Sequence, residues 1–561
     1  MSRSSRHINV LLGMNRKAGI ARFQNEEFDV CIIGAGASGA GAALDAALRG
    51  YRVALIDRGD FAGETSSRST KLIHGGVRYL EQAVKKLDLA QLRQVRHGLA
   101  ERRTVIRNAP HLAHPLALLT PVFSLFEGIY ITIGLRLYDF FARHDAFPKG
   151  RWLSKKEAMA QMPTLTSNMH SAVQYYDGQL NDARYALALA HSADEAGAAV
   201  ATYMNVTGFD RKDNQLTAAA VEDVLTGVSI PIRAKLFLNC TGPYADAVRL
   251  MANPTTEPRI RPSKGVHITL PRDVLQSDSA MLIPKTADGR VVFAIPFEDK
   301  VFVGTTDDDY TDGRREPMLE PDEVRYLLDT LRPYVANVPD ASEVQAGFGG
   351  IRPLIVSNRA NTKALLRDHE VEEDPESGLL SLLGGKWTTY RIMAQDAIDR
   401  VAEKLNSTTR STTATHYLIG GENYRFDDWQ TLQTTYQLPA DVCQHLMKTY
   451  GSRADRVDKL LRENSQWAGR LSADRPYIRA EIIYQVREEM AITIRDVLAR
   501  RWRLELLDWR LTNELVPIVA ELMGAELNWS PEEQERYVGQ YQALLATFIR
   551  EAGLTTKLVT T

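Results

Sequence analysis

Three glycines with the spacing Gly-x-Gly-x-x-Gly constrain the fold of this chain more than any other feature. Gly34, Gly36 and Gly39 follow the apolar run 30–33, which is typical of a buried parallel strand. The first glycine permits a tight turn, the second lets the backbone approach a pyrophosphate, and the third lets a helix pack against the strand. The partly positive N-terminus of that helix, with Ser38 in its first turn, would face the phosphates.

The residues after the glycines complete a strand–helix–strand unit. Residues 42–48 are small and apolar, as in a packed helix, and Gly50 stands where a glycine commonly ends one. Residues 52–56 predict a second strand, and Asp57 at its end is placed to accept a hydrogen bond from an adenosine ribose. The glycines alone would also fit an ordinary glycine-rich turn, but the whole unit predicts a dinucleotide site.

Size and composition indicate a globular protein of two or three domains. The chain has 561 residues, of which 44% are hydrophobic and 25% charged. Its net charge of −2 argues against a dedicated nucleic-acid binder. The three cysteines, Cys31, Cys240 and Cys443, form no Cys-x-x-Cys pair, which fits a reducing compartment. No apolar run is long enough to span a membrane.

The N-terminal extension, residues 1–27, is basic and has no acid before Glu26. Its apolar piece, residues 8–14, is short and lacks a small-residue cleavage site, which argues against a secretory signal. We interpret the extension as a disordered tail. An organelle-targeting segment and a patch for anionic lipid are the alternatives.

A second predicted ligand-binding segment follows the first unit. Every residue from 65 to 71 carries a hydroxyl or a positive charge, and two glycines follow at 75 and 76. Beside a dinucleotide site this favours a second wrap around a bulky polar ligand, although a solvated Ser/Thr loop would have the same composition. Residues 236–242 predict another strand that ends in a turn at Gly242, a further place to meet the nucleotide.

The middle of the chain predicts both helices and strands. Residues 81–108 and 181–197 predict helices, residues 199–206 and 215–221 predict strands, and residues 264–310 predict an antiparallel sheet. The strongly apolar segment 128–143, with a basic end, fits a membrane contact, a core helix or a contact between two copies of a homodimer. The acidic run 307–309 does not match the spacing of a calcium loop, so we expect a solvated turn there and no metal.

Three cationic residues stand out after the predicted antiparallel sheet: Arg352, Arg367 and Lys386. Lys386 precedes a predicted helix, residues 389–405, whose threonines are candidate N-caps. Residues 406–416 form a Ser/Thr-rich linker, and the remainder, residues 417–561, predicts helices without strands. Apolar residues at spacings of three and four between 483 and 498 predict one packed helix face.

Taken together, these segments resemble the FAD-dependent glycerol-3-phosphate dehydrogenases of the aerobic type over nearly the whole length from residue 28. The shared segments are GAGASGAG, SSRSTKLIHGGVRYLE, NCTGP, KGVHI, VGTTD, GGIRPL, LRDHE, GGKWTTYR and, in the helical part, REEMAITIRDVLARRWRL. Many members have SSASSKLIHGG where this chain has SSRSTKLIHGG, which places a cation, Arg68, near the cofactor loop.

The resemblance implies an α/β fold (α+β overall), in which a Rossmann-like FAD-binding domain is interleaved with a substrate cap built on antiparallel sheet. Residues 28–405 would form these two parts and residues 417–561 an all-helical domain. Noncovalent FAD is the implied cofactor. The implied contacts of the FAD are Gly34, Gly36, Ser38, Gly39, Asp57, Thr65, Ser66, Ser67, Lys71, Leu72, His74, Gly242, Gly385, Lys386, Thr388 and Thr389.

The resemblance also implies the chemistry, which is oxidation of sn-glycerol 3-phosphate to dihydroxyacetone phosphate with transfer of a hydride to FAD. Substrate would be held by Arg78, Tyr79, Arg352, Arg367 and Lys386. Arg367 and Lys386 are expected on the phosphate dianion, and Arg352 nearer the reacting hydroxyl.

His267 is our candidate general base, because an imidazole titrates near working pH; His74 is the second candidate. A helix that begins near Thr388 and Thr389 could also stabilise negative charge on the flavin through its dipole, although a plain N-cap would have the same sequence.

Family members pass electrons to a membrane quinone and lie on the membrane surface without spanning it. We therefore expect a peripheral enzyme on the cytoplasmic face of the cell membrane. The alternatives are an oxidase that uses oxygen and releases hydrogen peroxide, and a non-catalytic flavin-binding module at the membrane. The clustered cations and His267 argue against the last of these.

Overall fold

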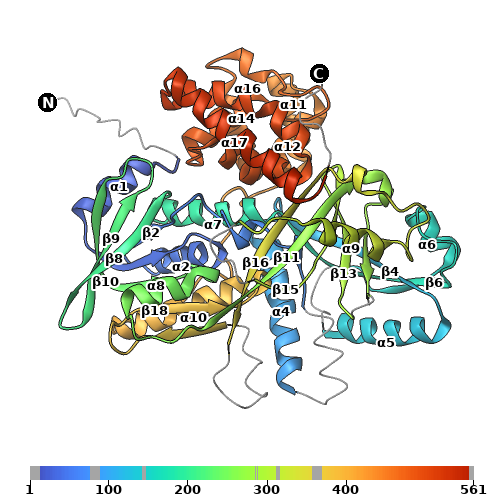
Figure 1. Cartoon of the computed structure of the whole chain (residues 1–561), viewed down its shortest axis with the longest axis horizontal. Coiled ribbons are helices and arrows are strands. Elements are labelled where there is room, and N and C mark those ends of the chain that lie inside the picture. Colours follow the sequence, from blue (N-terminus) through green and yellow to red (C-terminus); the bar gives the residue numbers. More distant parts are fainter. Residues whose placement is uncertain are drawn as a thin grey trace.

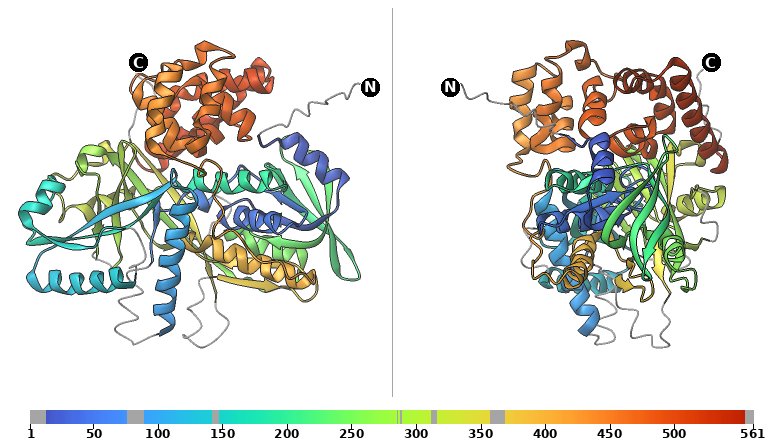
Figure 2. Two further views of the ribbon diagram at one scale, coloured as in Figure 1. Left: turned by 180° about the vertical axis from the view of Figure 1, so that it is seen from behind. Right: turned by 90° about the vertical axis from the view of Figure 1, so that its left-hand side faces the viewer.

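The computed structural model describes residues 13–75, 89–141, 147–284, 286, 289–310, 316–356 and 369–554. Two large sheets lie side by side, and the C-terminal helices lie across one edge of both (Figure 1; Figure 2). This arrangement confirms the predicted Rossmann-like domain, the sheet-based cap and the all-helical C-terminal part.

The first sheet has a parallel centre that is built around β1 (Phe28–Ile33). β1 pairs in parallel with β10 (Ser229–Asn239) on one side and with β2 (Val53–Ile56) on the other. Further strands extend the sheet: β7 (Ala199–Ala201), β8 (Met204–Lys212), β9 (Gln215–Asp223), β17 (His369–Glu373) and β18 (Leu380–Gly384). The C-terminal ends of the parallel strands β1, β2 and β10 therefore meet at one edge of the sheet, as the sequence predicts.

Helices cover both faces of this sheet. Val30 and Ile32 of β1 pack in the core under α2 (Ala37–Leu48), α7 (Asp182–Glu195) and α10 (Tyr390–Lys404), whereas Cys31 and Ile33 pack in the opposite core. That opposite core also contacts α8 (Ala245–Ala252). Burial of successive residues on opposite faces explains why residues 30–33 of β1 are all apolar.

The N-terminal extension contains an ordered helix, α1 (Arg16–Asn25), so its interpretation as a disordered tail is wrong for these residues. Phe23 is fully buried and its ring meets the edge of Phe28. A Cβ at Gly19 would overlap the carbonyl oxygen of Val200, which shows how closely α1 lies on β7. The cation Arg16 pairs with Asp223 at 2.5 Å. Arg16 and Phe23 thus attach α1 to the domain.

The second sheet forms the cap and has ten strands. They are β3 (Leu72–Ile73), β4 (Ala113–Val122), β5 (Arg151–Ser154), β6 (Ser171–Leu180), β11 (Ile260–Pro271), β12 (Ala280–Ile283), β13 (Val292–Phe297), β14 (Lys300–Gly304), β15 (Asp308–Asp309) and β16 (Ala346–Ile355). The pairing is antiparallel except between β4 and β12. Helices α4 (Leu89–Asn108), α5 (Leu125–Phe141), α6 (Lys155–Gln161) and α9 (Pro321–Leu331) belong to this part of the chain.

The C-terminal part consists of helices. They are α11 (Trp429–Tyr436), α12 (Ala440–Tyr450), α13 (Ala454–Leu460), α14 (Arg479–Glu488), α15 (Leu504–Leu507), α16 (Trp509–Leu527) and α17 (Pro531–Glu551), with a π-helical segment at Asp496–Arg501. Ile483, Ile494, Val497 and Leu498 pack in one core, as the spacing over 483–498 predicts. They do not share one helix face, because α14 ends at Glu488 and Met490 adopts a left-handed conformation with φ 53°.

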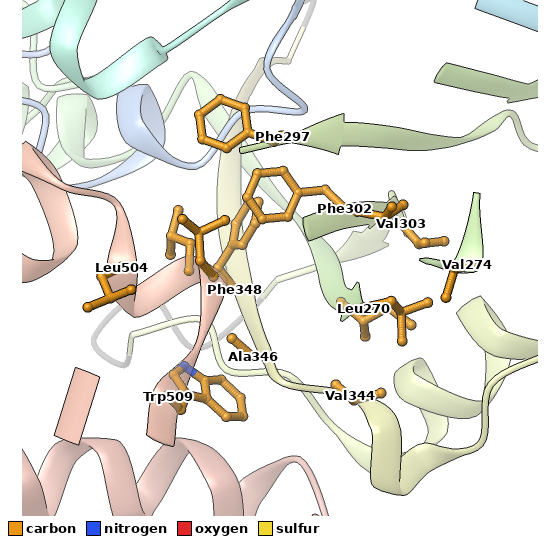
Figure 3. Packing of buried hydrophobic residues seen from close by; sticks show 14 of the residues in the cluster. Leu270, Val274, Phe297, Phe302, Val303, Val344, Ala346, Phe348, Leu504 and Trp509 are labelled. Atoms are coloured by element: carbon orange, nitrogen blue, oxygen red, sulfur yellow. The ribbon is translucent and has the colours of Figure 1, made fainter. Parts of the chain in front are cut away.

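One apolar core joins the cap to the C-terminal helices. Leu504 and Trp509 pack beside Ala346 and Phe348 of β16, and Phe302 lies next to Phe348 (Figure 3). Burial of such large side chains contributes about 1.5–3 kcal/mol each. The C-terminal helices are therefore tied to the strand that carries Arg352. Within the described residues, no helix combines the length and apolar character needed to cross a bilayer.

Candidate functional site

The three fingerprint glycines are required by close contacts at the end of β1. Gly34 has φ +103°, and a Cβ there would lie 2.7 Å from the carbonyl oxygen of Cys240. A Cβ at Gly36 would lie 2.8 Å from Oγ of Ser66, and one at Gly39 would overlap the carbonyl oxygen of Gly34. The turn consequently presents bare backbone at the start of α2.

The N-terminus of α2 faces a cavity. Gly36 is the N-cap residue and offers no side-chain cap, while the Ala37 N–H donates to Oγ of Ser66 at 2.9 Å. Gly36, Ala37 and Ser38 all line the cavity. Backbone N–H groups and the helix dipole at such a position favour an anion such as a pyrophosphate.

Asp57 stands at the end of β2, beside the glycine turn. Its carboxylate accepts hydrogen bonds from the Ala35 N–H at 2.6 Å and from the Gly59 N–H at 2.9 Å. Burial raises the pKa of Asp57 to about 6, and these two hydrogen bonds limit the rise. The carboxylate is thus a fixed acceptor at the cavity wall, as a ribose diol requires.

The cavity has a volume of about 250 Å³ and is lined by residues from the ranges 33–38, 57–66, 204–206, 240–251 and 382–393, together with Pro353. The predicted cofactor contacts among its lining residues are Gly34, Gly36, Ser38, Asp57, Thr65, Ser66, Gly242, Gly385 and Lys386. Pro353 of β16, next to Arg352, also lines it, so the cavity reaches the cap sheet. An elongated ligand with a nucleotide end and a second end at the cap would fit these walls, as FAD requires.

The hydroxyl loop, which we define as residues 65–71, joins the two sheets. Oγ1 of Thr65 donates to the Ile351 carbonyl at 2.6 Å, and the Ser66 carbonyl accepts from the indole N–H of Trp387 at 2.8 Å. Arg68 donates to the Gly349 carbonyl and pairs with Glu316 at 2.5 Å. The loop therefore contacts the fingerprint, the cap and the turn before α10.

Lys71 does not line the cavity, although it is one of the predicted cofactor contacts. Its fully buried ammonium donates to the carboxylate of Asp182 at 2.8 Å and to the carbonyls of Ser67 and Ser69. Burial lowers the pKa of Lys71 to about 7, despite the opposing effect of Asp182. Lys71 thus fixes the backbone of the hydroxyl loop from the protein interior. Ser67 and Leu72 are buried outside the cavity too.

The turn before α10 is shaped by Gly384 and Gly385, with φ +69° and +91°. Thr389 is the N-cap residue of α10, as the sequence predicts, but its hydroxyl caps no helix N–H and instead donates to the Lys386 carbonyl. Oγ1 of Thr388 accepts from the N–H of His74 at 3.2 Å. Lys386 in this turn forms part of the cavity wall. The N-terminus of α10, which follows the turn, has no side-chain cap.

His267 lies on β11 of the cap sheet, where it is paired with Gly304 of β14 on one side and with Phe348 of β16 on the other. Its Nε2 is 3.2 Å from Oγ1 of Thr70 in the hydroxyl loop, and its ring stacks on Phe348 with 4.7 Å between centroids. A Cβ at Gly304 would overlap the imidazole, so that glycine makes room for it. Burial lowers the pKa of His267 well below its usual value, and the charges of Lys71 and Arg352 lower it further. The imidazole is therefore neutral at working pH.

Arg352 lies across neighbouring strands of the same sheet. Its guanidinium donates to Oγ1 of Thr305 and to the Thr306 carbonyl, both at 3.1 Å, and pairs with Asp307 at 3.1 Å. A Cβ at Gly265 would overlap the guanidinium. The interpretation of residues 307–309 as a solvated turn misses the contact of Asp307 with Arg352.

Three of the predicted substrate contacts, Arg78, Tyr79 and Arg367, lie outside the described residues. The structure adds cavity residues that the sequence did not suggest: Arg58, Glu64, Met204, Asn205, Val206, Tyr244, Met251, Trp387 and Tyr390. Arg58 stacks on the Tyr244 ring at 3.9 Å, from a segment almost two hundred residues away along the chain. Such a contact has no local sequence signal.

Comparisons with known proteins agree with this geometry. Residues 29–400 match the family model described as FAD-dependent oxidoreductase, and residues 411–534 match the C-terminal domain of alpha-glycerophosphate oxidase. The FAD cofactor predicted from the sequence is thereby confirmed.

Curated relatives and solved structures identify the family more specifically than the two domain models do. The mitochondrial glycerol-3-phosphate dehydrogenase of Rattus norvegicus is 40% identical over 532 residues, which cover 92% of this chain and 73% of that protein. A probable mitochondrial glycerol-3-phosphate dehydrogenase of Dictyostelium discoideum is 39% identical, over 96% and 88% of the two chains. The FAD complex of the Bacillus halodurans glycerol-3-phosphate dehydrogenase superposes with TM-score 0.80 at 27% identity, over 98% and 100%. This chain therefore belongs to the family of FAD-dependent glycerol-3-phosphate dehydrogenases.

Proposed function

We propose that this protein oxidises sn-glycerol 3-phosphate to dihydroxyacetone phosphate at the cap end of the cavity and that its electrons pass to a membrane quinone. The observation that carries the proposal is that one cavity runs from the fingerprint glycines to Lys386 and to Pro353, next to Arg352. FAD, when bound, supplies the hydride acceptor. The chain must then hold the substrate phosphate, orient its second carbon and receive the hydroxyl proton.

Lys386 is the described cation best placed to bind the phosphate, because its turn forms part of the cavity wall. Arg78 and Arg367 are proposed to complete the phosphate site, as the family resemblance implies. A phosphate dianion needs several donors, and a combination of lysine and arginines supplies both a compact charge and bidentate contacts.

Arg352 is proposed to act on the reacting hydroxyl. Thr305 and Thr306 fix its guanidinium, and Asp307, whose side chain is more than half exposed, is its ionic partner. Burial lowers the pKa of Arg352, but an arginine stays protonated. A held cation at this point would favour alkoxide character on the substrate oxygen.

His267 is proposed as the group that receives the proton. Its neutral state leaves one ring nitrogen able to accept, and Nδ1 has no hydrogen-bond partner among the described residues. The Oγ1 of Thr70 next to Nε2 would orient the ring. His74 is the alternative base. It follows the hydroxyl loop closely in sequence, and its backbone N–H donates to Thr388 at the turn before α10.

Membrane attachment is proposed to use α5. Phe126 and Ile133 have 85% and 64% of their surface exposed, and Ile129 and Tyr130 lie between them on the same face of the helix. The α5 helix lies on the side of the cap away from the C-terminal helices (Figure 1). An exposed apolar helix face of this kind suits the interfacial zone of a bilayer, and peripheral attachment would bring the flavin site close to a membrane quinone.

The experiment that tests the acceptor uses enzyme whose flavin has been reduced by sn-glycerol 3-phosphate without oxygen. A water-soluble quinone is added in one arm and oxygenated buffer in the other, and the return of flavin absorbance is timed. The proposal expects fast reoxidation by quinone and slow reoxidation by oxygen. Fast reoxidation by oxygen with formation of hydrogen peroxide would instead establish an oxidase, an alternative favoured by the match of residues 411–534 to a glycerophosphate oxidase domain.

A further inference from the structure

A short segment of the C-terminal helical domain carries four arginines toward the cofactor side of the molecule. We call residues 495–503 the arginine segment; it includes the π-helical turn Asp496–Arg501. Arg501 and Arg503 are among the largest fully buried side chains of the described chain. A buried guanidinium is costly unless acceptors surround it, so the partners of these arginines indicate what the segment holds.

Arg503 binds the underside of the hydroxyl loop. Its Nη2 donates to the Ser67 carbonyl and, at 3.0 Å, to the carboxylate of Asp182, and Nη1 donates to the Ala499 carbonyl at 2.9 Å. The same carboxylate accepts from the ammonium of Lys71. Asp182 and the Ser67 carbonyl are therefore shared by one cation of the loop and one cation of the helical domain.

Arg500 and Arg501 bind the turn that follows Asp57. The Arg500 Nε donates to the buried carboxylate of Asp60 at 2.6 Å, and Arg501 pairs with the same carboxylate oxygen. Asp60 is three residues beyond Asp57, the acceptor at the ribose end of the cavity. The turn with the ribose acceptor is consequently fixed from outside its own sheet.

Arg495 reaches the hydroxyl loop through a shared acid. It pairs with Glu316 at 2.5 Å, and Glu316 also pairs with Arg68 at 2.5 Å. Burial tends to raise the pKa of Glu316, but the two arginines hold it well below its usual value. The acid is thus ionised between two cations, one from each domain.

We infer that the arginine segment makes the C-terminal helical domain part of the cofactor site, with Arg503 as the positioning residue of the hydroxyl loop. The packing of Leu504 and Trp509 on Ala346 and Phe348 fixes the end of the segment against the cap (Figure 3). Arg503 holds the hydroxyl loop directly and Arg495 holds it through Glu316, whereas Arg500 and Arg501 hold the turn after Asp57. Both the loop and the turn contribute residues to the cavity wall. The inference rests on the assignment of the cavity to FAD and not on the identity of the substrate.

The test compares Arg503→Met with Arg503→Lys and with a control, Arg487→Ala. Arg487 lies in the same domain as Arg503. It forms ion pairs with Glu463 and Glu526 at the surface of the domain, and these pairs do not involve the hydroxyl loop. Two quantities are measured, hydrogen exchange of the amides of residues 65–71 in the cofactor-free protein and the Kd for FAD. Neither measurement needs substrate, so a failure to oxidise glycerol 3-phosphate would refute the proposed function without touching this inference.

Arg503→Met removes one of the two cations that donate to the Ser67 carbonyl and to the Asp182 carboxylate, so loop exchange and the Kd for FAD should each rise about ten- to hundredfold. Arg503→Lys keeps the positive charge and one hydrogen-bond donor, so its loop exchange and Kd for FAD should lie between those of the wild type and of Arg503→Met. If Arg503→Met does not fold, the comparison of Arg503→Lys with the wild type tests the inference. Arg487→Ala should leave both quantities unchanged. Wild-type loop exchange and FAD affinity in both Arg503 variants would overturn the inference, as would an equal loss in Arg487→Ala.

Discussion

Asp57 gives the cofactor site a pH dependence that can be worked out from its surroundings. Because burial raises the pKa of its carboxyl to about 6, the cofactor-free protein holds a neutral carboxyl below that pH and a carboxylate above it. A ribose diol binds the carboxylate, which can accept hydrogen bonds on both oxygens. The affinity for FAD should therefore be fully present above pH 6 and fall as the pH drops through that value.

The magnitude follows from the ionised fraction. One unit below the pKa about a tenth of the carboxyl groups are ionised, so the Kd for FAD should rise about tenfold between pH 7.5 and pH 5. Asp57→Asn keeps the size of the side chain but removes the charge and loses one of the two backbone hydrogen bonds, to Ala35 or to Gly59. It should weaken FAD binding about ten- to hundredfold at pH 7.5 and abolish the pH dependence.

The assay is titration of FAD-free protein with FAD, followed by flavin fluorescence at constant ionic strength. Glu64→Gln is the matched control, because Glu64 also lines the cavity but makes no contact with the glycine turn like that of Asp57. Its pH profile should keep the shape of the wild-type profile with a midpoint at somewhat lower pH, because the charge of Glu64 contributes to the raised pKa of Asp57. A Kd that stays constant over the range in the wild type, or a pH dependence that survives in Asp57→Asn, would refute the reasoning.

Three further substitutions test other parts of the site. Gly304→Ala should place a methyl group against His267, at a cost of about 1–3 kcal/mol for overpacking, and slow flavin reduction in single-turnover measurements while FAD still binds. Arg352→Lys should lose the fork-shaped set of hydrogen bonds and lower kcat about ten- to hundredfold, with an unchanged Kd for FAD as the control. Phe126→Asp combined with Ile133→Asp should reduce sedimentation with lipid vesicles and leave turnover with a water-soluble acceptor unaltered; undiminished vesicle binding would exclude α5 as the membrane contact.

The nucleotide half of the site could be predicted because its determinants are local. The turn at Gly34, Gly36 and Gly39, the helix after it and Asp57 lie within thirty residues, and each has a backbone reason for its residue type. Gly50 ends α2 with φ +86°, as its position indicates. The antiparallel strands of the cap could also be predicted from the sequence, because the alternation of apolar and polar residues and the length of a strand are local properties.

The remaining parts depend on partners that are distant in sequence. Lys71 is one of the predicted cofactor contacts, yet its ammonium binds Asp182, more than a hundred residues away. The helix α1 was missed because only Gly19 and Phe23 of its ten residues are buried, which leaves too little apolar periodicity to detect. A spacing of three and four across Met490 fits one long helix, but tertiary packing selects two separate elements with a left-handed residue between them.

We propose that the cavity binds FAD with its reactive end at the cap cations, where sn-glycerol 3-phosphate is oxidised. The most direct measurement is the visible absorbance of the purified FAD-loaded protein after sn-glycerol 3-phosphate is added without oxygen. The flavin should bleach with formation of one dihydroxyacetone phosphate per FAD, and glycerol without its phosphate should not produce this effect at the same concentration. A flavin that stays oxidised in saturating glycerol 3-phosphate would contradict the claim.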